Sequence, residues 1–345
     1  MTSAISTFDL SHAFPSARGP ARTPRGSAGL QESRPSGVQA LRGVTLEVAP
    51  GEFFGMFGPN GAGKTTLIRI LTTLIIPSGG HAQVHGFDVV REPGRVRALV
   101  GLVYSNENSF YGRLTGQQNL EFFAALQNLG RQQARRRIAE LFELFDLAAA
   151  AHAPFQSYST GMRQKMNVAR ALLHNPPVIF LDEPTKGMDV LTAETLRRLL
   201  RSELVERQRK TVILTTHDLE EMEALCDRVG ILEAGRLRAV GAPADLIREA
   251  SASVVYRLEL AGAANGLVEA LEGLAAVQSL AVVARAESSL VLDLVLNDTA
   301  APEAEVWEAL VARRVKVRRY GPKEDGLVNL LKRVDPRMEK GTDGG

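Results

Sequence analysis

Short apolar segments alternate with longer segments of amphipathic, helical pattern over most of the first two thirds of the chain. The apolar segments read LRGVTLEV, FFGMF, LVGLVY, VIFL and VILTT, and helical patterns begin at Lys64, near residue 116 and at residue 192. Strands that are apolar throughout are typical of parallel sheets covered by helices on both faces. The pattern predicts an α/β domain at residues 1–245, with a helical subdomain at about 105–175.

The pattern changes after residue 245. Strand, helix, strand, strand, helix and strand follow one another in the segments VVYRLEL, NGLVEALEGL, VQSLAVVAR, SLVLDLVL, PEAEVWEALVARR and VKVRRY. This order is typical of the split βαβ, ferredoxin-like arrangement, so we predict a small α+β domain at residues 246–345. Residues 15–37, rich in Pro, Gly, Ser and Arg, follow neither period and predict a flexible insertion in the first domain.

Composition narrows the possible partners. The chain has 345 residues, with 41 basic and 39 acidic side chains and a formal net charge of +2, which gives no overall field for nucleic acid. We therefore expect no nucleic-acid partner. No apolar run approaches the ~20 residues that span a bilayer, so a membrane role would require another chain to cross it. The single cysteine, Cys226, follows an apolar pattern and is interpreted as a buried core residue.

The segment GPNGAGKT matches the phosphate-binding pattern G-x-x-x-x-G-K-[ST] and lies between a predicted strand and a predicted helix. Glycines in such a turn let successive N–H groups converge on phosphate oxygens at the helix N-terminus. Lys64 would reach the β- and γ-phosphates of ATP, and the Thr65 hydroxyl would bind Mg²⁺. The predicted nucleotide-binding residues are Gly58, Pro59, Asn60, Gly61, Ala62, Gly63, Lys64, Thr65 and Thr66.

Two carboxylates end the apolar strand VIFLDE, and a histidine ends the strand VILTTH. Because side chains alternate along a strand, the two acids are expected to do different work. Asp182 would orient the magnesium shell and Glu183 would polarise the attacking water. Ligands bind at the carboxyl edge of open α/β sheets, so His217 is a candidate sensor of the γ-phosphate.

The motifs GPNGAGKT, YSTGMRQ, VIFLDEP, KGMD and TTHD occur in the order found in ABC transporter ATPases, and residues 38–245 resemble the nucleotide-binding domain of that family. The sequence STGMRQ is similar to the corresponding motif of the drug- and polysaccharide-exporter branch, in which a separate membrane protein forms the pore. The resemblance implies that His217 is a switch histidine and that Asp189 belongs to a loop crossing a dimer interface. It also implies a signature helix that faces the partner's ATP and begins with Ser159, Thr160, Gly161, Met162 and Arg163.

The sequence departs from this family at two places. The glutamine that usually follows the strand after the phosphate-loop helix is absent; Ser105 and Asn106 occupy that neighbourhood and are candidate metal contacts. Thr115 and Gln118 instead have the spacing of a helix capping box. For Phe14 two interpretations stay open, because this residue either stacks on adenine or simply closes the first strand.

The leading hypothesis is an ATP-hydrolysing subunit of an ABC exporter, which converts ATP and water to ADP and phosphate. By resemblance, closure of a homodimer, or of a dimer with a related ATPase, powers a separate transmembrane permease subunit. The predicted location is the cytoplasmic face of the inner or plasma membrane. Two alternatives stay open: a soluble ABC-type ATPase acting on ribosomes or DNA, and a regulatory subunit that hydrolyses ATP weakly.

Overall fold

The computed structural model describes residues 3–15, 37–104, 109–216, 218–251, 255–261, 266–286, 289–297 and 301–322. The chain divides into two compact units, Met1–Pro243 and Ala244–Gly345, and each unit is described by itself. No helix in these residue ranges is long and apolar enough to cross a membrane.

A six-stranded sheet in the order β10-β9-β3-β8-β7-β6 forms the centre of the first unit. Its strands are β3 (Phe53–Phe57), β6 (Val100–Tyr104), β7 (Val178–Asp182), β8 (Thr211–Thr216), β9 (Arg228–Glu233) and β10 (Arg236–Gly241). All are parallel except β10, which pairs antiparallel with β9. Every residue of β3 and β8 is buried, which confirms the predicted parallel, covered sheet.

A second, antiparallel sheet has the order β2-β1-β4-β5. Its strands are β1 (Ile5–Pro15), β2 (Gly37–Val48), β4 (Gly79–Val84) and β5 (Phe87–Asp88). The pairing of β1 with β2 continues to Pro15 and Gly37, so both end residues of the predicted insertion are strand residues. The rest of that insertion lies outside the described residues. One apolar core joins this sheet to the central sheet around α1 (Lys64–Leu71).

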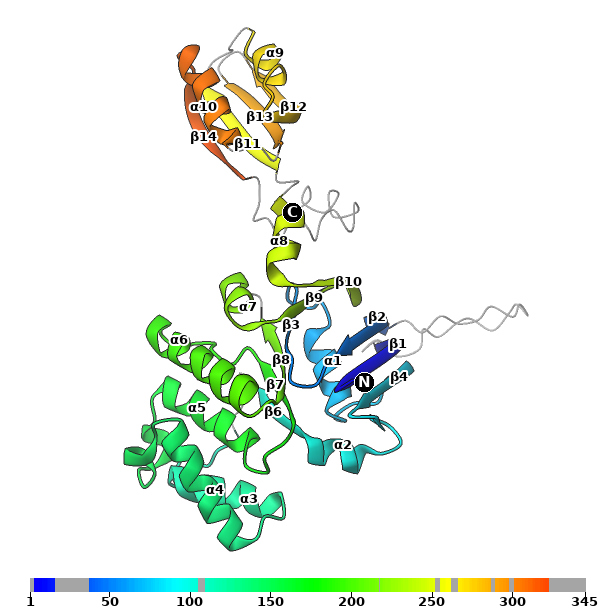
Figure 1. Cartoon of the computed structure of the whole chain (residues 1–345), viewed down its shortest axis with the longest axis vertical. Helices are drawn as coiled ribbons and strands as arrows, with labels where there is room; N and C mark the ends of the chain where they lie inside the picture. Colours follow the sequence, from blue (N-terminus) through cyan, green and yellow to red (C-terminus); the bar gives the residue numbers. More distant parts are fainter. Residues whose placement is uncertain are drawn as a thin grey trace, which may run out of the picture. The chain divides into compact units, whose positions relative to one another are not determined.

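Helices cover the central strands on the side away from the antiparallel sheet (Figure 1). The remaining helices of this unit are α2 (Pro93–Leu99), α3 (Gly116–Leu126), α4 (Arg131–Leu144), η1 (Ala148–Ala150), η2 (Phe155–Ser157), α5 (Thr160–Ala171), α6 (Val190–Leu199), η3 (Leu200–Arg207) and α7 (Leu219–Leu225). The predicted capping box is present: the Thr115 hydroxyl accepts from the N–H of Gln118, whose side chain accepts from the N–H of Thr115. Helix α6 begins two residues before the predicted start because Asp189 caps it there.

The second unit has the ferredoxin-like order that its sequence predicts. Its elements are α8 (Pro243–Ser251), β11 (Val255–Ala261), α9 (Leu267–Glu272), β12 (Val277–Ala286), β13 (Ser289–Leu296), α10 (Pro302–Ala312) and β14 (Lys316–Pro322). The sheet order is β12-β13-β11-β14, and all of its pairs are antiparallel. Alternate leucines of β11 and β13 form one core with apolar residues of α9 and α10.

Candidate active site

A cleft of about 810 Å³ opens at the carboxyl ends of the parallel strands β3, β6 and β7. This volume lies within the range of ~300–1,000 Å³ that is usual for ligand sites. The predicted residues Pro59 to Thr66, Phe14, Asp182 and Glu183 all line it. It is also lined by Val38, Gln39, Ala40, Arg69, Leu74, Tyr104 and Lys186, which were not predicted.

The phosphate loop connects β3 to α1 and depends on its glycines. Gly61 and Gly63 have positive φ angles of 81° and 109°, and a Cβ at Gly63 would lie 2.5 Å from the carbonyl oxygen of Ala40. Gly63 is also the N-cap of α1 and provides no capping side chain. The helix therefore directs its first N–H groups, and the positive end of its dipole, toward the cleft.

Lys64 is buried at the first position of α1, with 7% of its surface exposed. Its ammonium group donates to the carbonyl oxygens of Gly58 and of Pro59, the latter at 3.0 Å. Burial lowers the pKa of Lys64, whereas the carboxylates of Glu183 and Asp182 act in the opposite direction. The loop thus holds the Lys64 ammonium group where it would contact the oxygens of a bound phosphate.

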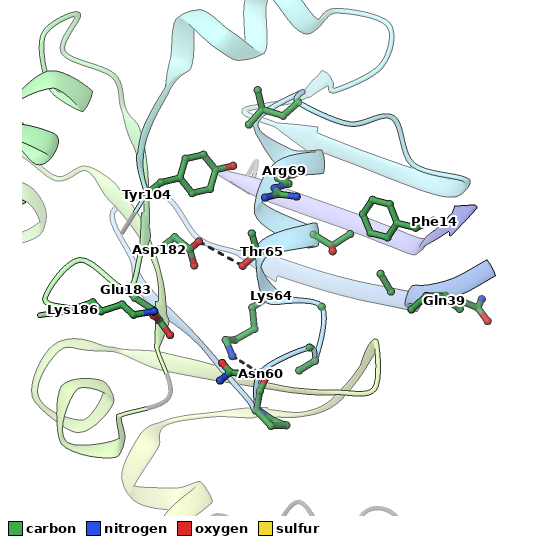
Figure 2. A pocket seen from close by; sticks show the side chains of 18 residues that line it. Phe14, Gln39, Asn60, Lys64, Thr65, Arg69, Tyr104, Asp182, Glu183 and Lys186 are labelled. Carbon is green, nitrogen blue, oxygen red and sulfur yellow. Dashed lines mark hydrogen bonds and ion pairs between the residues drawn. The ribbon is translucent and has the colours of Figure 1, made fainter. Parts of the chain in front are cut away.

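Asp182 ends β7 beside the start of α1. Its Oδ2 lies 3.5 Å from the Thr65 hydroxyl (Figure 2). Its Oδ1 accepts a hydrogen bond from Thr215 of the neighbouring strand β8. Carboxylate and hydroxyl oxygens are ligands that suit Mg²⁺. The two oxygens of Thr65 and Asp182 therefore fit a magnesium site next to the phosphate loop.

Glu183 follows Asp182 but does not turn to the opposite side of the sheet. Its φ angle is +49°, which breaks the alternation of the strand, and both carboxylates line the same cleft. The Glu183 carboxylate is mostly buried and forms an ion pair of 2.8 Å with Lys186. The hydrogen bond to Glu183 raises the pKa of Lys186. Strand alternation alone did not predict this arrangement.

Phe14 lies on β1, at the end of the cleft away from the two carboxylates (Figure 2). It pairs with Val38 of β2, and its ring packs edge-on against His12 with centroids 4.6 Å apart. The residue thus closes the first strand and also lines the cleft. Both interpretations of Phe14 are compatible with its position.

The residues Ser159 to Arg163 begin α5 and do not line this cleft. The Ser159 hydroxyl caps the helix by accepting from the N–H of Met162 at 3.2 Å, and Arg163 donates to the carbonyl oxygen of Gln156 at 2.8 Å. Asp189 caps the neighbouring helix α6 by accepting from the N–H of Thr192 at 3.0 Å. Hydrogen bonds therefore hold the start of α5, but the cleft of the same chain does not include the predicted signature residues.

Three predicted residues, Ser105, Asn106 and His217, lie outside the described residues. Sequence reasoning missed Lys186 and Thr215. The spacing of Glu183 and Lys186 resembles that of an ion pair one turn apart and was an available signal. Thr215 faces Asp182 only through the parallel register of β7 and β8, which single-sequence patterns do not give.

A strand, glycine loop and helix next to two carboxylates define a P-loop ATPase. The family model for ABC transporters matches residues 41–186. The chain is 38% identical over 205 residues to the ABC transporter ATP-binding protein NatA of Bacillus subtilis (strain 168), covering 59% of this chain and 82% of that protein. It is 43% identical over 218 residues to the daunorubicin resistance ATP-binding protein DrrA3 of Streptomyces coeruleorubidus, covering 63% and 68%.

A solved structure described as the dimeric structure of MJ0796, a bacterial ABC transporter cassette, is also similar. It matches with a TM-score of 0.58 and 25% identity, covering 69% of this chain and 98% of that chain. The chain belongs to the ATP-binding subunits of ABC transporters, and like them it binds and hydrolyses ATP.

Cys226, buried with 8% exposure, has the core position that its sequence predicted.

Proposed function

We propose that this chain is the ATP-hydrolysing subunit of an ABC exporter and works as a dimer beneath a separate membrane-spanning permease. The observation that carries the proposal is the composition of the cleft. It contains the phosphate loop and both carboxylates, whereas the signature residues Ser159 to Arg163 lie elsewhere. A second chain, identical or related, would bring its α5 N-terminus to the exposed side of this cleft.

ATP would then contact both chains only when the dimer is closed. This difference in contacts gives the nucleotide a higher affinity for the closed state, which is what a ligand-driven change requires. Hydrolysis removes the bridging phosphate and lets the dimer reopen. The relative DrrA3 is named as a drug-resistance protein, which supports export as the process that this cycle powers. We place the chain at the cytoplasmic face of the membrane.

The residues of the cleft suggest a division of work in hydrolysis. Lys64 and the start of α1 would hold the phosphates, and Thr65 and Asp182 would hold Mg²⁺, which neutralises phosphate charge when bound. Glu183 would orient and deprotonate the attacking water, with the ion pair to Lys186 holding its carboxylate in place. Phe14 is proposed to stack on adenine, and His217 to sense the γ-phosphate. Ser105 and Asn106 stay candidates for the metal shell.

Replacing Glu183 with Gln tests the role of its carboxylate. We expect turnover to fall at least ~100-fold, since loss of a general base typically has an effect of this size. The variant should also accumulate as a dimer in ATP and Mg²⁺, measured by light scattering after gel filtration. Glu194→Gln, an exposed residue of α6 paired with Arg198, is a matched control and should behave like the wild type. Normal turnover in Glu183→Gln would contradict the proposed role of the Glu183 carboxylate in hydrolysis.

Mixing two inactive chains tests the shared site. Lys64→Ala destroys the phosphate loop and Ser159→Arg blocks the signature, yet a mixed dimer would contain one intact composite site. An equal mixture should recover about a quarter of wild-type turnover, because half of the dimers are mixed and each has one working site. No recovery would contradict the shared site. Comigration with a multi-span membrane protein in detergent would test the permease partner.

A further inference from the structure

The turn that follows β7 contains Glu183 in an unusual backbone conformation. Its φ angle of +49° is disfavoured for a residue with a Cβ, and such angles persist only where the surrounding structure holds them. The N–H of Glu183 donates to the carbonyl oxygen of Thr215 in β8 at 3.1 Å, and the N–H of Lys186 donates to the carbonyl oxygen of Glu183 at 3.2 Å. The direction of the Glu183 carboxylate therefore depends on what holds this turn in place.

Thr185, two residues after Glu183, attaches the turn to α7. Its hydroxyl donates a hydrogen bond to Oε1 of Glu221 at 2.9 Å, and its carbonyl oxygen accepts from the N–H of Met188 at 3.1 Å. Neither Thr185 nor Glu221 is among the residues that line the cleft. The hydrogen bond therefore supports the turn that contains Glu183 and does not contact the nucleotide site.

Glu221 is a firmly held acceptor. Its side chain is only 2% exposed, and its Oε1 lies 3.6 Å from Nε of Arg197 on α6. Nη2 of Arg197 lies 3.7 Å from Oδ2 of Asp218, the residue that caps α7. A buried carboxylate is costly unless it is paired and hydrogen-bonded, so Glu221 stays with these partners. The Thr185 hydroxyl is thus bound to a group that two helices hold in place.

We propose that Thr185 and Glu221 are positioning residues for ATP hydrolysis, because their hydrogen bond holds the turn after β7 so that the Glu183 carboxylate stays in the cleft. The inference rests on the proposed role of Glu183 as the base that acts on water. Without this hydrogen bond the turn keeps its backbone contacts but loses its attachment to α7, and the carboxylate is less well placed. ATP binding, which depends on the phosphate loop, changes little.

Removing the Thr185 hydroxyl tests the inference in steady-state ATPase assays of the full chain. Thr185→Val keeps the shape of the side chain, and we expect kcat to fall about tenfold while KM for ATP stays within about twofold, since a misplaced catalytic group slows the chemical step. Thr185→Ser keeps a hydroxyl and should restore most of the turnover. Thr195→Val removes an exposed hydroxyl of α6 that donates to the carbonyl oxygen of Leu191, and this control should behave like the wild type.

A merely structural role of Thr185 would lower the urea midpoint of Thr185→Val but leave kcat of the folded chain unchanged. A normal kcat in Thr185→Val, or an equal loss in Thr185→Ser, would therefore overturn the proposal.

Variants of Glu221 test the other side of the hydrogen bond. Glu221→Gln keeps an oxygen that can accept from Thr185, whereas Glu221→Met has a similar length and no such acceptor. We expect Glu221→Gln to retain most of the wild-type kcat and Glu221→Met to lose about as much as Thr185→Val, with circular dichroism showing that both are folded. Equal turnover in the two Glu221 variants would contradict the proposal.

A double variant separates this inference from the role of Glu183 itself. If Thr185 acts through Glu183, adding Thr185→Val to Glu183→Gln should not slow single-turnover hydrolysis further, because coupled residues are not additive. A further loss of about tenfold would overturn the proposal. Normal turnover in Glu183→Gln alone would reject the proposed base, whereas slow Glu183→Gln with normal Thr185→Val would reject only the positioning by Thr185 and Glu221.

Discussion

Thr215 provides a sharp test of how the cleft positions Asp182, the carboxylate proposed to bind Mg²⁺. The residue is fully buried in β8, and its hydroxyl donates a hydrogen bond to Asp182 Oδ1. Valine has nearly the same shape, so Thr215→Val removes this hydrogen bond without opening a cavity. A hydrogen bond to a charged group contributes about 1.5–3 kcal/mol, and we expect a loss of about 2 kcal/mol in the free energy of unfolding of the first unit.

The functional consequence follows from the other carboxylate oxygen. Asp182 Oδ2 lies 3.5 Å from the Thr65 hydroxyl, so a carboxylate that has lost its support at Oδ1 is less well placed to share a cation with Thr65. We expect the Mg²⁺ concentration that gives half-maximal ATPase activity to rise at least ~5-fold, equivalent to about 1 kcal/mol. The assay is steady-state phosphate release over a magnesium titration at saturating ATP.

Thr211 at the other end of β8 provides the control. Its hydroxyl is also buried and accepts from the N–H of Gly51 at 2.9 Å, away from the carboxylates. Thr211→Val should lose about 1–3 kcal/mol and keep its magnesium dependence. Urea titrations followed by circular dichroism would measure both variants, and fluorescence of Trp307, the single tryptophan, reports the second unit separately. Equal magnesium curves for Thr215→Val and wild type would refute the reasoning.

Three further predictions concern different parts of the first unit. Phe14→Ala should weaken ATP binding by about 1–3 kcal/mol in calorimetry if the ring stacks on adenine, whereas Phe8→Ala, an exposed residue of the same strand, should not; equal affinities would leave Phe14 as a strand residue only. Burial lowers the pKa of Lys210 from 10.5 to about 8, so the unfolded chain binds more protons than the folded chain above pH 8. Relative to Lys210→Met, the free energy of unfolding of the wild type should therefore rise by about 1–3 kcal/mol between pH 8 and pH 10, and parallel pH profiles would contradict this. Thr115→Ala should cost about 1 kcal/mol of stability through loss of the capping box, with Gln117→Ala, a half-buried residue of the same turn outside the box, as control; no difference between the two in urea titrations would argue against the cap.

The central strands could be predicted because their burial is visible in the sequence. β3 and β8 are apolar or small over their whole length, since both faces of the parallel sheet are covered. Strand β4, GGHAQV, was not predicted. Only two of its residues are buried and it contains two glycines, so neither its composition nor its periodicity differs clearly from that of a loop.

In the cleft, too, some features could be predicted from the sequence and others could not. Lys64, Thr65 and Asp182 lie together as predicted, because parallel strands end at one edge of the sheet and the motif fixes the loop between β3 and α1. Glu183 was expected to face the bound phosphate and does line the cleft, but the left-handed backbone angle that turns it there, at a residue that is not glycine, was not predicted. Its partner Lys186 follows from that turn, and Thr215 follows from strand register. The register that brings Thr215 to Asp182 is set by tertiary packing, whereas the ion pair of Glu183 and Lys186 is local.

The segment from Asp182 to Asp189 connects the chemistry of the cleft to the surface proposed for the partner chain. It begins at Asp182, the proposed magnesium ligand, and ends at Asp189, the N-cap of α6, whose Thr192 lies against the start of α5. A Cβ at Gly161 would lie only 2.8 Å from the Thr192 methyl carbon, so the start of α5 and the start of α6 are in close contact. In the proposed dimer, a displacement of Asp189 would be passed both to α5 and, six positions back along the chain, to Glu183. If the proposed function holds, the carboxylate that acts on water and the surface that meets the second chain lie on one continuous segment of backbone, so water attack and arrival of the second chain would be coupled.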